Sequence, residues 1–358
     1  MDNAAPPRRS LLILSKGAQQ IPTLPALLPE YRLLCGTVGD IAQADEVLAW
    51  GRKPSALRAK AAADAAGLPL ITVEDGFLRS VGLGAEDPPL SLIVDPLGIY
   101  YDATRPSRLE QLLQNEPCSP ELLQRAAALR EAICTAGVTK YNLPGATWKR
   151  PAGVERVILV PGQVESDASI RYGAHRIRRN LDLLKAVRER HPLAWLLYKP
   201  HPEVLAGTRA AGEDEERTSD WCNQVVGDVP FHELLSEVDE VHVLTSQSGF
   251  EALLRGVPVT TYGQPFYAGW GLTVDRDLSP DVQARRTRRL SLDELVAATL
   301  IRYPTYVSRI TRKFTTPERT LIEIQNWDEV PTQGRTPTWR EMIQRLLPTA
   351  LRTLPGKS

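Results

Sequence analysis

Short apolar runs alternate with helical patterns along most of this chain, and this alternation constrains the fold more than any other feature. Four runs in the first half fit strands of a parallel sheet buried on both faces: LLILS, RLLCG, EVLAWG and LPLITV. An alanine-rich helix, KPSALRAKAAADAAG, separates the last two runs and ends at Gly67. The second half repeats the pattern with strands VILVPG, LAWLLYKP, NQVVGD, EVHVLTS and VPVTTYG and with helices that include NLDLLKAVRER and SGFEALLRG. Such alternation indicates right-handed crossover units and open α/β sheets.

The chain has 358 residues, which suits two domains rather than one core. Residues 140–154, KYNLPGATWKRPAGV, are rich in Pro and Gly and lack periodicity, so they predict the linker. We expect Rossmann-like domains at residues 1–150 and 151–315, followed by a helical segment at 316–358. Two doubly wound domains joined in this way form a cleft at the carboxyl ends of their strands, where such sheets bind ligands.

Charge and cysteine content narrow the class of protein. Lys plus Arg and Asp plus Glu are equal at 43 each, so the net charge offers no support for a nucleic-acid partner. The four cysteines form no CxxC pair, as expected for reduced thiols in a cytoplasmic protein. No apolar stretch approaches eighteen residues. The tail TWREMIQRLLPTALRTL is basic and amphipathic, which suits packing on the body or contact with an anionic membrane surface.

Carboxylates follow two of the predicted strands. VEDGFLRS places Glu74 and Asp75 after LPLITV, where a carboxylate can accept or donate a proton in the cleft; an ordinary acidic Asp-Gly turn is the alternative. PGQVESDAS places Gln163, Glu165 and Asp167 in the short loop after VILVPG. Two carboxylates crowded into one loop between a strand and a helix indicate chemistry, but spacing alone does not choose between them.

Two further clusters suit a phosphate. YKPHPEV places Lys199 and His201 at a strand end, between prolines that stiffen the backbone. In LTSQSGFEALLRG, Ser246 and Ser248 precede a helix N-terminus, where they can cap the helix or join its N–H groups in holding an anion. Glu251, one turn into that helix, is placed to reach a ribose or base. Together these residues predict a nucleotide-phosphate site.

The remaining motifs exclude some site types and suggest a sugar. The five histidines show no HxH or HExxH spacing and no DxD pair directly follows one of the strands predicted above, so we expect no metal and no cofactor. GxGxxG is also missing, which argues against a dinucleotide oxidoreductase. YGQPFYAGWGLTVDR sets aromatic side chains among glycines after the last strand of the second sheet, so Gln264 and Tyr267 are candidates for holding a sugar; core packing is an equal alternative.

At these motifs the sequence resembles the bacterial capsule polysaccharide β-Kdo transferases. The stretches that carry the resemblance are long and ordered, and they extend from about Ala49 to about Tyr306: VEDGFLRSVGLG, PPLSLIVDPLGIYYDATRPS, KYNL, VPGQVESDASI, YKPHPEV, DEVHVLTSQSGFEALLRG and QPFYAGWGLTVDR. Many such proteins carry two transferase modules, whereas this chain has length for one and looks closer to the carboxyl-terminal module. The resemblance implies a GT-B-like fold with the acceptor on the first domain and the donor on the second.

By this resemblance the donor is CMP-β-Kdo, the configuration is retained, and the acceptor is a Kdo-terminated, phospholipid-linked glycan of capsule linker synthesis. Double displacement would proceed through a covalent adduct on Asp167, with Glu165 as the nearest rival. The Glu-Asp-Gly, His-Pro and Ser-x-Ser motifs also resemble those of bacterial GT-B sialyltransferases, which use another CMP-linked keto-sugar acid. By that second resemblance His201, Ser246 and Ser248 would contact the CMP phosphate, and Glu74 or Asp75 would handle the acceptor proton. From their charge alone, Lys199 or Arg79 would pair with the Kdo carboxylate. Gln163, Lys199 and Glu251 are further candidates for binding the donor. The implied partners are other capsule biosynthesis proteins, at the inner face of the inner membrane.

The chain departs from the family pattern at Ser166, where members commonly carry a second acid. Two other functions stay open from the residues. One is an inverting transferase for another nucleotide sugar with Asp75 as base, and the other is a non-catalytic capsule component that binds glycan.

Overall fold

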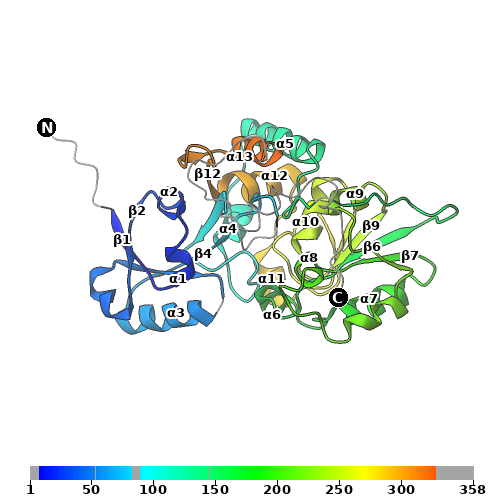
Figure 1. Cartoon of the computed structure of the whole chain (residues 1–358), viewed down its shortest axis with the longest axis horizontal. Helices are drawn as coiled ribbons and strands as arrows, with labels where there is room; N and C mark the ends of the chain where they lie inside the picture. The colour runs from blue at the N-terminus through cyan, green and yellow to red at the C-terminus, as the bar shows by residue number, and fades with distance from the viewer. Residues whose placement is uncertain (1–7, 53, 83–88, 144, 328–358) are drawn as a thin grey trace, which may run out of the picture.

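The computed structural model describes residues 8–52, 54–82, 89–143 and 145–327. Two sheets stand side by side, with the first at the blue end of the chain and the second in green and yellow (Figure 1). This confirms the predicted α/β class with two Rossmann-like sheets, the arrangement of GT-B proteins. The predicted tail helix at 338–354 lies outside the described residues.

The first sheet has seven strands in the order β13-β12-β5-β4-β3-β1-β2. Its strands are β1 (Arg9–Ile13), β2 (Tyr31–Cys35), β3 (Glu46–Trp50), β4 (Leu70–Asp75), β5 (Ser91–Asp95), β12 (Pro304–Val307) and β13 (Phe314–Thr315). The four predicted strands are β1 to β4, and they pair in parallel as expected. β5, β12 and β13 were not predicted, and their antiparallel pairing makes this sheet mixed.

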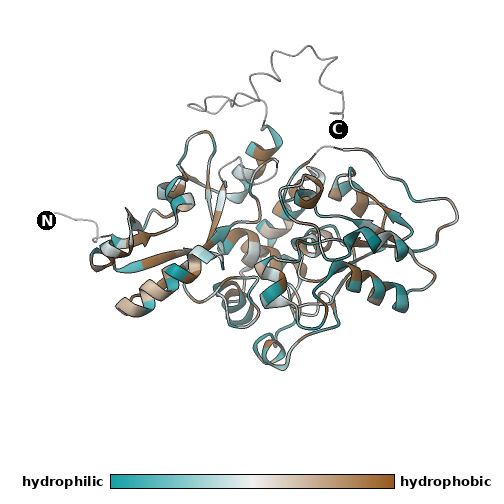
Figure 2. Ribbon diagram, turned by 60° about the horizontal axis from the view of Figure 1, so that its bottom comes forward, coloured by the Kyte–Doolittle hydropathy of each residue, from teal (hydrophilic) through white to brown (hydrophobic). Residues whose placement is uncertain are grey.

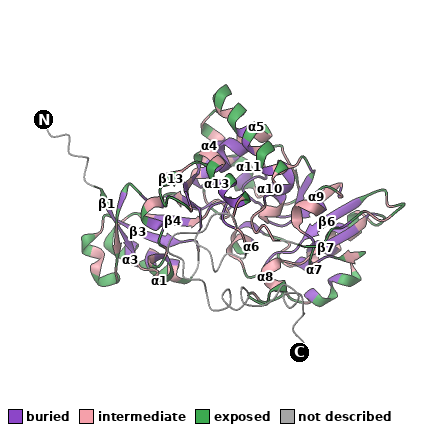
Figure 3. Ribbon diagram, turned by 45° about the horizontal axis from the view of Figure 1, so that its top comes forward, coloured by how far each residue is buried: buried purple, intermediate pink, exposed green. Residues whose placement is uncertain are grey.

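The second sheet has six strands, ordered β11-β10-β9-β6-β7-β8, and all of its pairs are parallel. Its strands are β6 (Val157–Pro161), β7 (Trp195–Lys199), β8 (Gln224–Val225), β9 (Glu240–Val243), β10 (Val259–Thr261) and β11 (Val274–Asp275). The five predicted strands correspond to β6 to β10. The strands of both sheets are largely apolar and buried (Figures 2 and 3), which is why their runs show little alternation.

The helices of the first half are α1 (Lys16–Gln19), α2 (Leu24–Leu27), η1 (Val38–Gln43), α3 (Pro54–Ala66), α4 (Arg108–Asn115) and α5 (Pro120–Thr135). Those of the second half are α6 (Ala168–Gly173), α7 (Asn180–Arg190), α8 (Pro202–Leu205), η2 (Glu215–Asp220), α9 (Phe231–Leu235), α10 (Gln247–Leu254), α11 (Pro280–Arg285), α12 (Leu292–Val296), η3 (Ala297–Arg302) and α13 (Pro317–Gln325). The predicted helix α3 ends before Gly67, whose φ of +67° is the left-handed conformation that glycine adopts without strain. No described helix is long and apolar enough to cross a bilayer.

The chain crosses back to the first domain near its described end. The predicted range 151–315 assigns residues 304–315 to the second domain, whereas β12 pairs with β5 in the first sheet, with Pro304 opposite Ile93. Helices α4, α5, α12 and α13 gather near the junction of the domains (Figure 1), and one core cluster extends from Phe77 and Leu109 to Val157 and Leu159. Hydrophobic periodicity identifies a strand but not its partner, so the sequence pattern could not show this return.

Candidate active site

A cavity of about 850 Å³ lies between the carboxyl ends of the strands of the two sheets. Segments that follow β3 and β4 form one wall, and segments that follow β6, β7 and β9 form the other. The structure brings ten of the twelve predicted site residues to this cavity: Glu74, Asp75, Arg79, Gln163, Asp167, Lys199, His201, Ser246, Ser248 and Glu251. The predicted cleft is therefore present, and it collects the four motifs.

The two carboxylates of the loop after β6 have different surroundings. Glu165 does not line the cavity; its carboxylate accepts hydrogen bonds from the backbone N–H groups of Asn180 at 2.7 Å and Glu213 at 3.0 Å. Asp167 lines the cavity and stands at the N-cap position of α6, yet its side chain accepts no capping hydrogen bond. An N-cap Asp usually does so. Its Oδ1 instead accepts from the guanidinium of Arg209, so Asp167 is the carboxylate of this loop that can meet a ligand.

Gln163 connects the ends of two neighbouring strands. Its side-chain oxygen accepts from the backbone N–H of Thr245 at 2.9 Å, and its amide nitrogen donates to the Thr245 hydroxyl at 3.1 Å. Both polar atoms of this buried side chain are therefore used within the protein. Gln163 thus holds the loop after β6 against the loop after β9, a positioning role for the predicted donor-binding residue.

Ser246 and Ser248 open helix α10 at the cavity. The Ser246 hydroxyl accepts from the Ser248 backbone N–H at 3.1 Å, so the capping alternative is present. Both residues also line the cavity, where hydroxyl and N–H donors suit an anion. The Ser246 carbonyl accepts a 2.5 Å hydrogen bond from the hydroxyl of Tyr267, which fixes this loop from behind.

The ring of His201 can donate a hydrogen bond into the cavity although it carries no charge. Its Nδ1 accepts a 3.3 Å hydrogen bond from the backbone N–H of Glu203, which places the ring proton on Nε2. Burial, together with the nearby cation of Lys140, lowers the pKa of His201 to about 4. At neutral pH the ring is therefore uncharged, and its Nε2–H is the atom that can bind an oxygen in the cavity.

The cations predicted to pair with a sugar carboxylate have protein partners. Lys199 donates to the carbonyl oxygens of Gly227 at 3.1 Å and Val229 at 2.6 Å, and burial lowers the pKa of its amine. Arg79 donates to Asp75 at 2.6 Å. Both side chains line the cavity, but these contacts commit much of their hydrogen-bonding capacity to shaping it.

Glu74 and Asp75 lie at the end of β4 on the opposite wall from Asp167. Glu74 accepts from the indole N–H of Trp50 at 3.1 Å and from the hydroxyl of Tyr101 at 3.2 Å. Asp75 is held by Arg79. Neither residue is merely an exposed acidic turn, because both line the cavity and both carboxylates are bound by other side chains.

Glu251 lines the cavity and binds a backbone N–H there, whereas Gln264 and Tyr267 do not line the cavity. The carboxylate of Glu251 accepts from the backbone N–H of Lys140 at 2.8 Å, and burial raises its pKa. Gln264 and Tyr267 are fully buried and do not line the cavity, so the core-packing alternative describes them. The side chain of Gln264 contacts His175 at 2.8 Å and accepts a hydrogen bond from the backbone N–H of Ser279 at 2.6 Å. These contacts give Gln264 a structural role instead of contact with a sugar.

Several cavity residues were missed from the sequence. Lys140 lines the cavity, and electrostatic interaction with Tyr141 first, and with the nearby carboxylates, raises the pKa of its amine. Lys140 belongs to the KYNL stretch, which the sequence indicated only as part of the linker and of the family resemblance. Arg209 lies in a polar loop without periodicity, so no pattern indicated that it reaches Asp167. Arg52 and Arg171 also line the cavity.

Comparisons with known proteins identify the family. The model of the family described as capsule polysaccharide biosynthesis protein matches residues 45–143 and 146–306. This chain belongs to that family. The match includes every predicted site residue, from Glu74 to Tyr267.

Two solved structures of Thermosulfurimonas dismutans KpsC resemble this capsule biosynthesis protein over most of its length. The β-Kdo 2,4 transferase has a TM-score of 0.80 and 35% identity, with 89% of this chain and 98% of that chain covered. The β-Kdo 2,7 transferase has a TM-score of 0.71 and 38% identity, with 89% and 99% covered.

Among curated proteins, the capsule polysaccharide modification protein LipA of Neisseria meningitidis serogroup B is 47% identical over 262 residues. The match covers 73% of this chain and 36% of LipA, so the chain spans about a third of the length of that relative.

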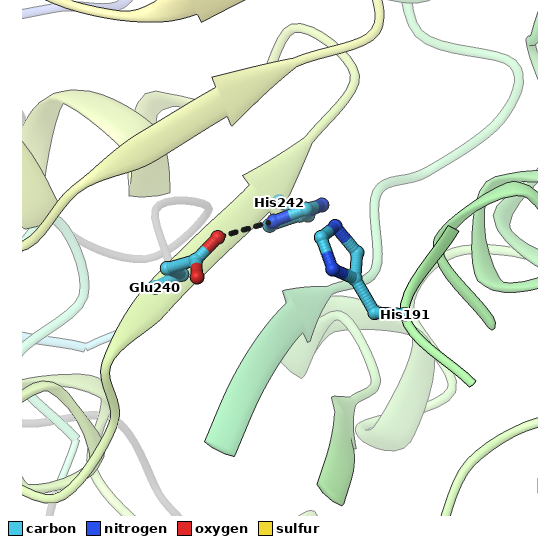
Figure 4. A group of neighbouring side chains, drawn as sticks. All are labelled: His191, Glu240 and His242. Carbon is cyan, nitrogen blue, oxygen red and sulfur yellow. Dashed lines mark hydrogen bonds and ion pairs between the residues drawn. The ribbon is translucent and has the colours of Figure 1, made fainter. Parts of the chain in front are cut away.

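A second polar group in this capsule biosynthesis protein has the mutual distances that a metal ion needs (Figure 4), and its residues do not line the cavity. The ligand atoms of His191, Glu240 and His242 are all within 4.8 Å of one another. The chain spacing of these residues, which is neither HxH nor HExxH, did not reveal the group. His242 Nε2 lies 3.0 Å from Glu240, and the other carboxylate oxygen binds Arg156.

The charges around this group favour an ion-pair network over a cation site. Arg156 already balances the carboxylate of Glu240, whose pKa is lowered to about 2 by the His242 hydrogen bond and by Arg156. Further arginines act on the two rings: Arg190 on His191 and Arg276 on His242. A divalent cation here would meet this positive charge. We therefore assign to His191, Glu240 and His242 a structural role in the second sheet.

Proposed function

We propose that this chain is a retaining β-Kdo transferase of capsule linker synthesis, with CMP-β-Kdo as donor and a Kdo-terminated, phospholipid-linked glycan as acceptor. The main support for this proposal is the position of Asp167. It is a carboxylate at a helix N-cap that caps nothing and lines the cavity, while its rival Glu165 is bound to backbone N–H groups elsewhere. Support also comes from the likeness to two β-Kdo transferase structures over 89% of the chain.

In the first step the carboxylate of Asp167 attacks the anomeric carbon of Kdo from the face opposite CMP. A new carbon–oxygen bond forms to Asp167, and the bond to the CMP phosphate breaks with its electron pair on the leaving phosphate. Arg209 holds Asp167 before the donor binds, so it must shift or release the carboxylate for this attack.

In the second step an acceptor hydroxyl displaces Asp167 from the anomeric carbon. Glu74 or Asp75, on the opposite wall, takes the hydroxyl proton as the new bond forms and Asp167 leaves as carboxylate. Because each step inverts the anomeric carbon, the product keeps the configuration of the donor.

The leaving phosphate is stabilised by donors of the second domain. The hydroxyls of Ser246 and Ser248 and the Nε2–H of His201 line this part of the cavity. Glu251 contributes to donor binding by accepting a hydrogen bond from the backbone N–H of Lys140, which positions that residue. Among the cations of the cavity, we assign the Kdo carboxylate to Lys140, because Lys199 is bound to two backbone carbonyls and Arg79 is bound to Asp75.

The proposal includes no metal and no cofactor. The cations and N–H groups of the cavity supply the charge stabilisation that the leaving phosphate needs. Transfer should therefore proceed at the same rate after treatment with a chelator. We further propose that the protein works at the inner face of the inner membrane with other capsule biosynthesis proteins, where its lipid-linked acceptor is made.

The test is the intact mass of the protein after incubation with CMP-Kdo, generated in place and without acceptor. We expect a gain of one Kdo residue, together with release of one CMP. Asp167→Asn should abolish the gain, because the amide is a poor nucleophile of nearly the same shape. The matched control is Asp64→Asn, the same change at an exposed Asp that pairs with Lys60 on α3; it should form the adduct as the wild type does.

Two results would replace this proposal. A product with the opposite anomeric configuration, formed without an adduct, would establish an inverting transferase with Asp75 as base. Neither adduct nor CMP release, even with a Kdo-terminated acceptor present, would favour a capsule component that binds glycan without catalysis. NMR of the product from a wild-type reaction also gives the linkage, which the two KpsC structures, a 2,4 and a 2,7 transferase, leave open.

A further inference from the structure

Two arginines and one tyrosine form a separate part of the cavity, which the reaction steps above do not use. Arg52 follows β3 in the first domain, and Arg171 and Tyr172 belong to α6 in the second. The guanidinium carbon of Arg52 lies 4.6 Å from the centre of the Tyr172 ring, and that of Arg171 lies 5.5 Å from it. These three residues, the Arg52–Arg171–Tyr172 cluster, therefore join both walls of the cavity by cation–π contacts.

The cluster keeps hydrogen-bond donors that the protein does not use. Arg52 pairs with Asp102 at 2.6 Å through one terminal nitrogen, while its Nε is buried without a partner among the described residues. Arg171 is exposed, and it makes no ion pair or side-chain hydrogen bond with any residue that the structure describes. Asp102 balances one of the two charges, so the cluster presents a net positive charge to the cavity.

The cluster lies beside the proposed base. Gly51, the residue before Arg52, has a φ of +54°, and a Cβ placed on it would lie 2.5 Å from a carboxylate oxygen of Glu74. The backbone that leads into Arg52 is therefore in contact with Glu74. A ligand whose hydroxyl reaches Glu74 would hold its neighbouring groups against Arg52.

We propose that the Arg52–Arg171–Tyr172 cluster is an acceptor subsite for an anionic sugar, and that it binds the carboxylate of the terminal sugar acid. A guanidinium matches a carboxylate with two parallel N–H···O bonds, and an aromatic face suits the C–H face of a sugar ring. The cluster thereby selects acceptors that end in a sugar acid over neutral ones. This inference rests on the proposed transferase function, because it assigns the acceptor for the second step.

The test compares Arg171→Met with wild type on two acceptors that differ in one charge. Both are Kdo-terminated oligosaccharides on a neutral alkyl group without phosphate; one has the free carboxylate and the other its methyl ester. We expect Arg171→Met to raise KM for the acid about 10-fold with little change in kcat, as for loss of a charge-assisted hydrogen bond. For the ester, the two enzymes should have the same KM.

The matched control is Arg58→Met, the same change at an exposed arginine of α3 that does not line the cavity. It should leave both KM values at wild-type level. Arg171 is a better probe than Arg52, because removal of Arg52 would leave the buried carboxylate of Asp102 without its closest cation.

Three results would overturn the inference. An unchanged KM for the acid, or an equal rise for acid and ester, shows that Arg171 does not recognise the carboxylate. A rise only with a phospholipid-linked acceptor assigns the cluster to phosphate instead. In each of these cases, the adduct on Asp167 is also measured with donor alone, for wild type and for Arg171→Met. If both proteins form the adduct, the proposed function stands without the subsite. If wild type forms none, the function and the subsite are rejected together.

Discussion

A buried ion-pair group connects the two halves of the molecule and should contribute strongly to stability. Glu110 of α4 accepts from Arg285 at 2.7 Å and from Arg286, which follows α11, at 2.9 Å. Glu110 and Arg286 are each only 6% exposed. Arg286 also donates to the carbonyls of Pro265 and Ala268, in the segment that brings Phe266 to the cavity. Glu110→Gln removes the negative charge but keeps the size of the side chain.

The expected cost follows from what the substitution leaves behind. Breaking one partner out of a buried ion pair destabilises a protein by about 3–5 kcal/mol, because the remaining charge has no counter-charge. The glutamine oxygen still accepts one hydrogen bond, and Arg286 keeps two carbonyl partners. We therefore expect the lower end of that range, a loss of about 3 kcal/mol in the free energy of unfolding.

Urea denaturation monitored by tryptophan fluorescence measures this loss. The control is Asp293→Asn, which removes the partner of Arg130 in a pair whose side chains are both 31% exposed. A pair so exposed contributes less than about 1 kcal/mol. Equal losses for Glu110→Gln and Asp293→Asn, or a loss below about 1 kcal/mol for Glu110→Gln, would refute the reasoning from burial.

Three further predictions concern the cavity. His201 has a pKa of about 4 in the folded protein against 6.5 in the unfolded protein, so the unfolded state binds the proton first and stability falls as the pH drops from 6.5 toward 4. Urea denaturation at pH 7 and at pH 4.5 should therefore show that His201→Gln loses about 2–3 kcal/mol less stability than wild type. Equal losses for the two proteins would contradict this. Tyr267→Phe removes the hydrogen bond to the Ser246 carbonyl, and calorimetric titration should find that the protein binds CMP about 5-fold more weakly. Unchanged affinity for CMP would mean that the loop at Ser246 keeps its position without this hydrogen bond. Gly51→Ala sets a methyl group against Glu74, so in rapid-quench experiments the adduct should form normally but react with acceptor at least 10-fold more slowly, whereas slowed adduct formation would place Gly51 in the donor step.

Strands and helices with a strong apolar pattern were predictable from the sequence, and those that depend on pairing were not. Strands β1 to β4 and β6 to β10 correspond to runs of apolar residues that end at Gly, Pro or polar residues. β5 and β12 are also short and apolar, but nothing local states that they pair with each other across more than two hundred residues. The interval between them contains the whole second sheet, and only the tertiary structure brings their edges together.

The place of the site was predictable because parallel strands end at the same edge, so polar residues after several strands must meet. The direction of each side chain was not. Glu165 and Asp167 are two residues apart in one loop, and the choice between them depends on Asn180 and on the segment around Glu213, far along the chain. In the same way, the charge of Lys199 suggested a ligand contact, whereas the carbonyls of Gly227 and Val229 bind it. Residue type indicates what a side chain can do, and packing decides which partner it finds.

The return of the chain to the first sheet limits how this protein can be divided. An expressed fragment that stops at the linker lacks β12, which leaves the edge of β5 unpaired and open to association with other chains. An exchange of first domains between related transferases must therefore carry residues 304–315 together with the amino-terminal part. A recombination point placed only at the linker would combine a sheet from one parent with an edge strand from the other. The two domains are thus exchanged as three segments of sequence rather than two.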